Sequence, residues 1–176
     1  GPARYIGRMN APLYNNHILR LAASIPFHER LNDPMASVEK RSPVCGSRVT
    51  VDVNLDDDGR VCAIGMLVHA CALGQASASL MGAHVVGPKV EELDAARDEL
   101  TLWLAGERDA PPDWPGLEIF TPALPHSARH PSIRLGFEAV AEAVRQAAKV
   151  RVCWNTALTI TSPNMRRCSA LRWCSC

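Results

Sequence analysis

The sequence predicts an α+β fold, a single domain built around an antiparallel β-hairpin with helices before and after it. From residue 48 to residue 68, apolar side chains recur at every second position on both sides of an Asp-Asp-Asp-Gly turn, which is the pattern of paired strands. On either side of this hairpin, apolar residues recur at helical spacing instead. A chain of 176 residues is long enough for one such domain with its own core.

The first predicted element is a helix in the segment that follows Met9. Asn10 can cap this helix, Pro12 can open it, and Pro26 ends it. Its apolar residues recur at roughly helical spacing and are Leu13, Ile18, Leu21 and Ile25. Residues 28–44 are polar and irregular, so a loop is expected there.

Two strands, each with one buried face, are predicted next. The alternating apolar residues of the first strand are Val49, Val51, Val53 and Leu55. A turn at residues 56–59 is strongly indicated, because Asp tolerates unusual backbone angles and the glycine supplies a positive φ. The second strand spans Arg60 to Val68. Cys62 lies on its apolar face together with Ile64, Met66 and Val68, so we interpret Cys62 as a packing residue.

Three helices complete the predicted domain. The first carries an apolar stripe, and its small residues would let it approach the sheet closely; the stripe is formed by Leu73, Ala76, Leu80 and Ala83. Gly87 and Pro88 separate it from the second helix, which ends at Gly106. Residues 107–125 contain five prolines, and we expect an ordered or semi-ordered loop over the core. The final helix starts at about Ser132, and its apolar residues are Ile133, Phe137, Val140 and Val144.

These patterns divide the chain into three parts. We expect a flexible leader at residues 1–8, one domain at residues 9–148, and a poorly ordered tail at residues 149–176, which shows no sustained periodicity. The tail contains cysteines whose spacing fits none of the usual paired zinc-binding patterns: Cys153, Cys168, Cys174 and Cys176.

The bulk composition argues against several kinds of partner. Nineteen basic and eighteen acidic side chains leave a formal net charge of +1, so nothing attracts the whole chain to nucleic acid or to a membrane surface. Charged residues and prolines interrupt every apolar stretch well before the ~20 residues that span a bilayer, and the N-terminal residues lack an export pattern. We therefore expect a cytoplasmic protein. An odd count of seven cysteines favours thiol or metal chemistry over a disulfide framework.

Cys45 and Cys71 are the predicted functional residues. They are equally distant from Asp58 along the chain, so antiparallel pairing about the turn brings both to the same open end of the hairpin. Cys71 also lies at or near the start of a helix, where the helix dipole and unpaired backbone N–H groups favour a thiolate. The pairing of two distant thiols indicates a thiol or metal role rather than packing alone.

Four segments of the chain point to a family when they are taken in order. They are Pro43-Val44-Cys45-Gly46, the hairpin, Cys71 followed by Gln75-Ala76-Ser77-Ala78-Ser79, and Phe137-Glu138-Ala139-Val140. Together they resemble the U-type iron–sulfur cluster assembly scaffolds, the NifU-like and SufU-like family. The resemblance implies a small antiparallel sheet with helices packed on one face, the SufE/NifU-like scaffold fold, and ligands gathered at one exposed end.

The resemblance also implies a function. Such a protein is not an enzyme: it assembles an iron–sulfur cluster such as [2Fe–2S], taking sulfur from a cysteine desulfurase and passing the cluster to recipient apoproteins. Some related proteins bind zinc at this place instead. Thiolates are the usual ligands of iron–sulfur clusters, and an exposed site permits release.

Two of the four ligand positions that the resemblance implies are altered. The family has Cys-Gly-Asp where this chain has Cys45-Gly46-Ser47, and the third family cysteine aligns with Ser132. The expected cofactor and metal ligands are therefore Cys45 and Cys71, with the hydroxyls of Ser47 and Ser132 as weak substitutes. Among the histidines His130 is the first choice as an added metal ligand, followed by His69 and His126. Two of these residues also have a structural interpretation that competes with a ligand role. His130 can be a solvated loop residue, and Ser132 can be the N-cap of the final helix.

Several functions remain open at the level of the sequence. The first is a scaffold that binds a cluster or its iron through Cys45 and Cys71 and transfers it. The alternatives are a degenerate scaffold that acts as an interaction or regulatory module of the desulfurase system, and a zinc-binding sulfur acceptor. An enzyme with Cys71 as nucleophile and His69 or His130 as base is a weaker reading, because no substrate-pocket motif accompanies it. A homodimer could also share one cluster, because symmetry would then supply four cysteines.

Overall fold

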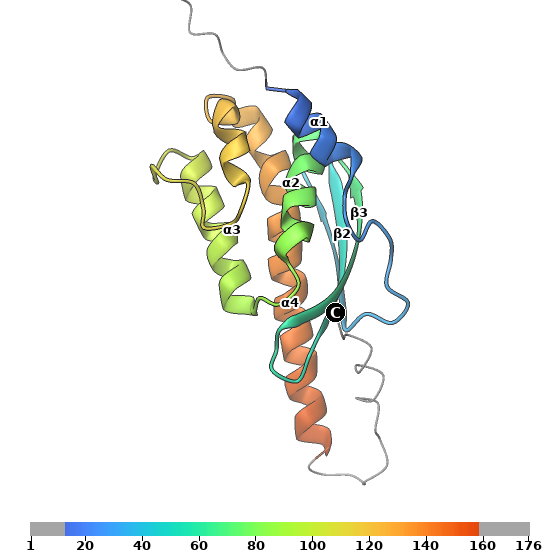
Figure 1. Cartoon of the computed structure of the whole chain (residues 1–176). Coiled ribbons are helices and arrows are strands. Elements are labelled where there is room, and N and C mark those ends of the chain that lie inside the picture. Colours follow the sequence, from blue (N-terminus) through green and yellow to red (C-terminus); the bar gives the residue numbers. More distant parts are fainter. Residues whose placement is uncertain (1–12, 159–176) are drawn as a thin grey trace, which may run out of the picture.

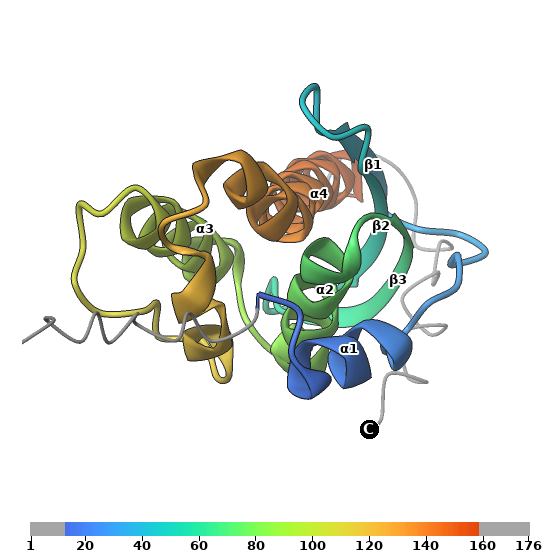
Figure 2. The ribbon, with the colours of Figure 1, turned by 90° about the horizontal axis from the view of Figure 1, so that it is seen from above.

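The protein is an α+β domain in which helices cover one face of a three-stranded antiparallel sheet, as the computed structural model of residues 13–158 shows (Figure 1). The elements are α1 (Asn16–Ala23), β1 (Ala36–Arg41), β2 (Arg48–Leu55), β3 (Val61–His69), α2 (Ala72–His84), α3 (Val90–Leu104), the 3₁₀ helices η1 (Leu117–Ala123) and η2 (Ser127–Arg129), and α4 (His130–Leu158). From above, α2 and α4 lie directly on the sheet, α3 lies beyond them, and α1 packs against α2 (Figure 2). The predicted fold class is confirmed.

The predicted loop at residues 28–44 contains β1, so that part of the prediction is wrong. β1 is an edge strand that pairs antiparallel with β2, from Ala36 opposite Val53 to Arg41 opposite Arg48. Only Ala36 and Val38 of its residues are buried. Such a short alternation does not stand out in a sequence, and the strand forms because β2 offers it a free edge.

The β2–β3 hairpin has the predicted turn but not a uniform register. Arg48 lies opposite His69, yet Leu55 lies opposite Val61, because a β-bulge between Asn54 and Leu55 shifts the pairing by one residue. The core position next to the turn is therefore taken by Val61, and Cys62 is only half-buried. Its thiol donates a 3.4 Å hydrogen bond to the Asn54 carbonyl, so Cys62, which we predicted as a packing residue, packs with only part of its side chain buried.

β2 is buried on both faces, whereas one buried face was expected. The second face is covered by the segment between α1 and β1, which runs along the side of the sheet away from the helices (Figure 2). Arg30 Nε and the Leu31 N–H donate to the carboxylate of Asp52 at 2.6 and 3.0 Å. The Met66 N–H donates to the Phe27 carbonyl at 3.0 Å. On this face of the sheet, an irregular segment thus provides the cover that helices provide on the other face.

Replacing Asp52 with alanine is expected to lower the free energy of unfolding by about 2 kcal/mol, because Arg30 and the Leu31 N–H lose a fully buried charged acceptor. Urea denaturation measures this loss. The matched control is Arg41→Ala, which breaks an exposed pair with Glu39 and should cost less than about 0.5 kcal/mol. Equal losses in the two variants would show that the Asp52 contacts do not hold the covering segment.

The predicted helices are present, with shifted ends. α1 begins at Asn16, after Asn15 accepts a 2.9 Å hydrogen bond from the Ile18 N–H; the predicted cap Asn10 lies outside the described residues. The proline-rich segment is ordered over the core as expected, and η1 buries Leu117 and Phe120 there.

α4 begins at His130, two residues before the predicted start, and it continues beyond the predicted boundary at 148 to Leu158. Pro131 fits the first turn, where its missing N–H needs no partner. Near the end of the helix, Arg151 donates to the Asp57 carbonyl in the β2–β3 turn. The predicted leader at residues 1–8 lies outside the described residues, as does the tail from residue 159 onward. Among the helices that are described, none has the length and apolar character needed to cross a membrane.

Candidate functional site

Cys45 lies at the tip of the turn that joins β1 to β2. The Ser42 N–H donates to the Ser47 carbonyl at 2.8 Å and closes the turn, while the Gly46 N–H donates to the Ser42 carbonyl at 3.2 Å. Gly46 has a φ of +68°, a left-handed conformation that favours glycine. The turn therefore holds Cys45 in an exposed position, next to Val44, which is 67% exposed.

Cys71 occupies the N-cap position of α2, two residues after β3 ends at His69. Its backbone carbonyl accepts the first helical hydrogen bond, from the Gln75 N–H at 2.9 Å, but its side chain caps no backbone N–H. The thiol is half-buried. It is therefore available for a ligand at the positive end of the helix dipole.

The start of α4 connects the two cysteines. Ser132 Oγ lies 3.0 Å from Cys45 Sγ. Ser132 also abuts α2 one turn after Cys71, because a Cβ placed on Gly74 would lie 3.1 Å from the Ser132 carbonyl oxygen. Cys45 and the first turn of α2 thus lie on either side of Ser132, at the end of the molecule where α4 begins (top of Figure 1).

Small residues of α2 make this contact possible. Ser77 donates a 2.6 Å hydrogen bond to the Ile133 carbonyl, and a Cβ on Gly136 would only reach ordinary contact with Ala78. We expected the small residues to bring α2 close to the sheet. Gly82 of α2 does lie against Met66 of β3, but the close backbone approach is made to α4, where Gly74 lies against the Ser132 carbonyl.

Three serines surround the sulfur of Cys45. Partial burial raises the pKa of this thiol, but hydrogen bonds from Ser132, Ser42 and Ser47 outweigh that effect and lower the pKa to about 6. Both Ser47 Oγ and Ser132 Oγ lie 3.0 Å from the sulfur, and all three serines are buried. The buried hydroxyl of Ser42 makes no hydrogen bond of ordinary geometry, so its contribution is weaker than a full hydrogen bond. Cys45 therefore favours the thiolate form at neutral pH more than an ordinary cysteine does.

Sequence reasoning identified two of these serines and missed the third. Ser132 is not the N-cap of α4, as one interpretation had it, because the helix starts two residues earlier and its hydroxyl bonds Cys45 instead. Ser42 was missed. The only sequence signal for Ser42 is its pairing with Ser47 across the turn. This pairing can be predicted only when residues 36–41 are recognised as a strand.

The predicted histidines do not gather around the cysteines. His130 Nε2 lies 2.9 Å from the Ala123 carbonyl, and residues two apart on a helix point to different sides, so His130 does not share the direction of Ser132. His69, at the end of β3, and His126, before η2, are exposed. Within residues 13–158, no three His, Cys, Asp or Glu side chains are grouped so that they could hold a metal ion.

Replacing Ser132 with alanine is expected to raise the pKa of Cys45 by about one pH unit, because a hydrogen bond to a charged group contributes on the order of 1.5 kcal/mol. The pH dependence of alkylation by iodoacetamide, followed at Cys45 by mass spectrometry, measures it. The unchanged protein should show a midpoint near pH 6. Ser127→Ala removes an exposed hydroxyl in η2, which has no hydrogen bond to Cys45, and is the control. A midpoint that stays at pH 6 in Ser132→Ala would exclude this role of the serine.

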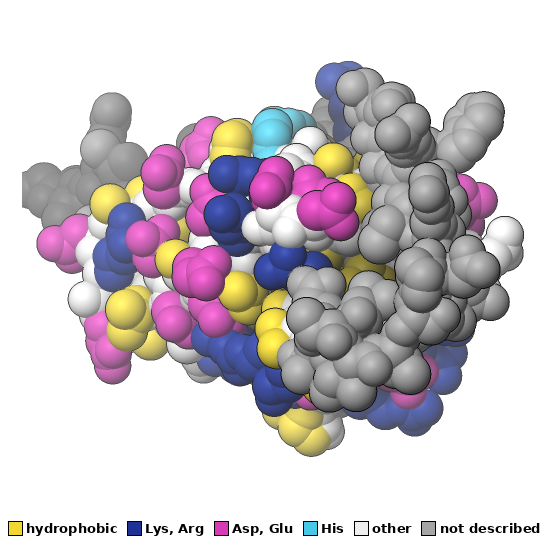
Figure 3. Space-filling model, turned by 90° about the horizontal axis from the view of Figure 1, so that it is seen from below, with side chains coloured by type: hydrophobic (Ala, Val, Ile, Leu, Met, Phe, Trp, Pro, Cys, Tyr) yellow, Lys and Arg dark blue, Asp and Glu magenta, His cyan; other side chains and the backbone are white. Residues whose placement is uncertain are grey.

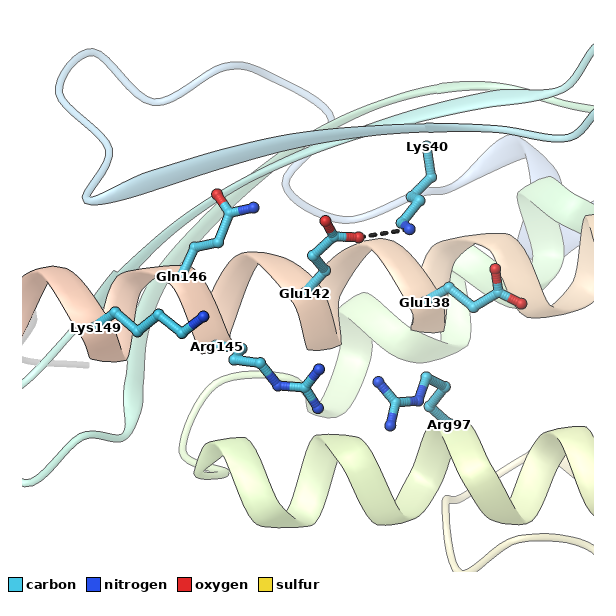
Figure 4. A pocket seen from close by; sticks show the side chains of 7 residues that line it. All are labelled: Lys40, Arg97, Glu138, Glu142, Arg145, Gln146 and Lys149. Atoms are coloured by element: carbon cyan, nitrogen blue, oxygen red, sulfur yellow. Dashed lines mark ion pairs between the residues drawn. The ribbon is translucent and has the colours of Figure 1, made fainter.

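A surface cavity of about 370 Å³ lies elsewhere, between β1, α3 and α4 (Figure 4). Its charged side chains mostly pair with neighbours: Lys40 with Glu142, and Arg145 with Asp94 at 2.8 Å. No cysteine or histidine lines it. The end of the molecule opposite the cysteines likewise shows interspersed acidic and basic side chains among its described residues (Figure 3). The cavity therefore does not offer the chemistry of the cysteine site.

Comparison with known proteins places the chain in a family. The profile described as "NifU-like N terminal domain" matches residues 14–110, more than half of the chain. The iron-sulfur cluster assembly scaffold protein IscU of Thermotoga maritima is 32% identical over 95 residues, which are 54% of this chain and 66% of that protein. The protein of the same name from Streptococcus pyogenes is 25% identical over 127 residues, 72% of this chain and 79% of its own length.

Solved structures agree with this assignment. The N-terminal part of a NifU-like protein from Brucella abortus has a TM-score of 0.73 and 37% sequence identity, and the match covers 78% of this chain and 95% of that one. A SufU protein from Fervidobacterium islandicum has a TM-score of 0.66 at 19% identity, covering 75% and 96% of the two chains, and it supports the fold alone. This chain belongs to the family of the NifU-like N-terminal domain.

Proposed function

We propose that this protein is a scaffold on which an iron–sulfur cluster is assembled and from which it is passed to recipient apoproteins. The observation that carries the proposal is the exposed Cys45 thiolate, held at the same end of the molecule as the half-buried thiol of Cys71. Thiolates are the protein ligands that iron–sulfur clusters require. The names of the Thermotoga and Streptococcus relatives support the same role.

The serines around Cys45 suit temporary binding. Hydrogen bonds from Ser47 and Ser132 keep the sulfur deprotonated before iron arrives, so little proton release is needed at neutral pH. Below pH 6 protons compete with iron for this sulfur, and we expect loading to fall there. The neutral hydroxyls are poor ligands for iron. A cluster held through few thiolates at an exposed tip is therefore free to leave.

In this proposal the protein is not an enzyme, and the cluster, such as [2Fe–2S], is its cargo. A cysteine desulfurase supplies the sulfur, and recipient apoproteins take the finished cluster, as the family resemblance implies. We place this activity in the cytoplasm, where thiols are kept reduced. His130 is left out of the ligand set because its Nε2 bonds the Ala123 carbonyl.

Anaerobic reconstitution with ferrous iron and sulfide tests the proposal. We expect visible absorption typical of a cluster, together with bound iron and acid-labile sulfide in equal amounts. A cluster-binding scaffold treated in parallel verifies the procedure. A colourless protein without iron, beside a coloured control, would rule out the scaffold role.

The serines at two ligand positions favour a second candidate. Ser47 and Ser132 stand where the family resemblance implies stronger ligands, and both bond Cys45. In this second candidate the protein is an interaction or regulatory module of the desulfurase system, or it binds zinc as a sulfur acceptor. Co-purification with the cognate desulfurase, and metal analysis of the protein as isolated, separate these readings. A desulfurase complex that forms without bound iron or zinc supports the module, whereas bound zinc supports the acceptor.

A further inference from the structure

Three basic side chains form a row across the outer face of the sheet, the face away from α2 and α4. Arg41 of β1 lies opposite Arg48 of β2, and Arg48 lies opposite His69 of β3. Residues that lie opposite each other in an antiparallel sheet point to the same side. Lys40 pairs with Glu142 of α4 and so points to the helices, which turns its neighbour Arg41 to the outer face. We call Arg41, Arg48 and His69 the basic row.

The basic row lies beside the two cysteines. Arg48 directly follows Ser47, whose Oγ lies 3.0 Å from Cys45 Sγ. His69 comes two residues before Cys71. The two outer members of the row are exposed, and Arg48 between them is half-buried. A protein that reaches the cysteines from the outer side of the sheet therefore meets the basic row.

The positive charge of the basic row is only partly balanced within the described part of the chain. Arg41 Nε donates to Glu39 Oε1 at 2.7 Å, and this hydrogen bond, together with the charges of Arg41 and Arg48, lowers the pKa of Glu39. The Arg48 side chain makes no hydrogen bond and no ion pair of its own within residues 13–158. One carboxylate thus faces two guanidinium groups. Because like charges opposite each other destabilise a sheet, a carboxylate from outside would be bound favourably here.

We infer that the basic row is the surface on which an acidic segment of the cysteine desulfurase docks. The inference rests on the proposed function, in which a desulfurase brings sulfur to the cysteines and must therefore contact this end of the protein. Guanidinium groups bind carboxylates through paired hydrogen bonds, and Arg48 has its donors available for them among the described residues. The basic row fixes the side from which the desulfurase approaches, and docking forms and breaks no covalent bond.

Isothermal titration calorimetry of the full chain with the cognate desulfurase tests this surface. Arg48→Glu should weaken binding at least about tenfold, because it sets a carboxylate against the carboxylates of the partner. Arg48→Gln should weaken binding less, and Arg48→Lys should retain most of it. Lys149→Glu makes the same change of charge on an exposed part of α4 and is the control, with binding unchanged. Circular dichroism verifies that each variant is folded.

A chemical cross-link identifies the other side of the contact. In Arg48→Lys, a carbodiimide should join the new amine to an Asp or Glu side chain of the desulfurase, and mass spectrometry locates both residues. Equal affinities of Arg48→Glu and the unchanged protein would overturn the docking surface, and so would a desulfurase that binds neither of them.

Loading with ferrous iron and sulfide needs no desulfurase and separates this inference from the proposed function. Arg48→Glu should load iron as the unchanged protein does, because Arg48 is not a ligand. An unchanged protein that loads no iron would remove the proposed function, and the docking surface would lose its purpose with it. A protein that loads iron while Arg48→Glu still binds the desulfurase fully would overturn the docking surface alone.

Discussion

Replacing either Cys45 or Cys71 with alanine is expected to reduce the iron bound after reconstitution by at least about tenfold, because each change removes a thiolate from a site that has no spare ligand among the described residues. The hydroxyls near Cys45 cannot compensate, because a neutral hydroxyl binds iron poorly. Iron and sulfide analysis with visible absorption measures the loss.

Cys62→Ala and Cys153→Ala are the matched controls for this prediction. Cys62 lies on β3 and donates its hydrogen bond to the Asn54 carbonyl, next to the turn at the other end of the hairpin, and Cys153 lies near the end of α4. Both variants should load iron as the unchanged protein does. Full loading of Cys45→Ala or of Cys71→Ala would show that the cluster is bound elsewhere.

The hairpin and the long helices could be predicted from the sequence because each repeats a clear period over many residues. β1 has only Ala36 and Val38 as buried apolar residues, and it becomes a strand through its pairing with β2. The segment that covers the outer face of the sheet has no period at all. It is held by single contacts, such as the hydrogen bond from the Leu31 N–H to Asp52, and no local sequence pattern predicts them.

The position of both cysteines at the same end of the hairpin could be predicted because it depends on topology rather than on detail, while their role as ligands stays a prediction. The bulge shifts the register by one residue, yet Cys45 and Cys71 still reach the same end, because both lie beyond the paired residues of β2 and β3. The surroundings of Cys45 could not be predicted. Ser132 lies 87 residues from Cys45 in the sequence and reaches the sulfur because α4 packs on β1 and β2, whose connecting turn carries Cys45.

Replacing Gly65 with alanine is expected to lower the free energy of unfolding by about 3 kcal/mol. The new Cβ would overlap the Glu29 carbonyl oxygen and lie 3.0 Å from the Leu31 nitrogen. Both are backbone atoms, so no side-chain rotation relieves the contact. The covering segment must move away from the sheet, and the hydrogen bonds from Arg30 and the Leu31 N–H to Asp52 weaken as it moves.

Gly136→Ala is the control, because its Cβ would meet only ordinary contacts at 3.6 Å or more and it lies inside α4, where alanine favours the helix by about 0.5–1 kcal/mol. Thermal unfolding should therefore place Gly65→Ala roughly 10 °C below the unchanged protein and Gly136→Ala at or above it. Adding Asp52→Ala to Gly65→Ala should cost less than the two separate losses together, since both act on the same covering segment. Fully additive losses would mean that Gly65 acts within the sheet alone. They would contradict the claim that the hydrogen bond between Asp52 and the Leu31 N–H holds the covering segment against the outer face.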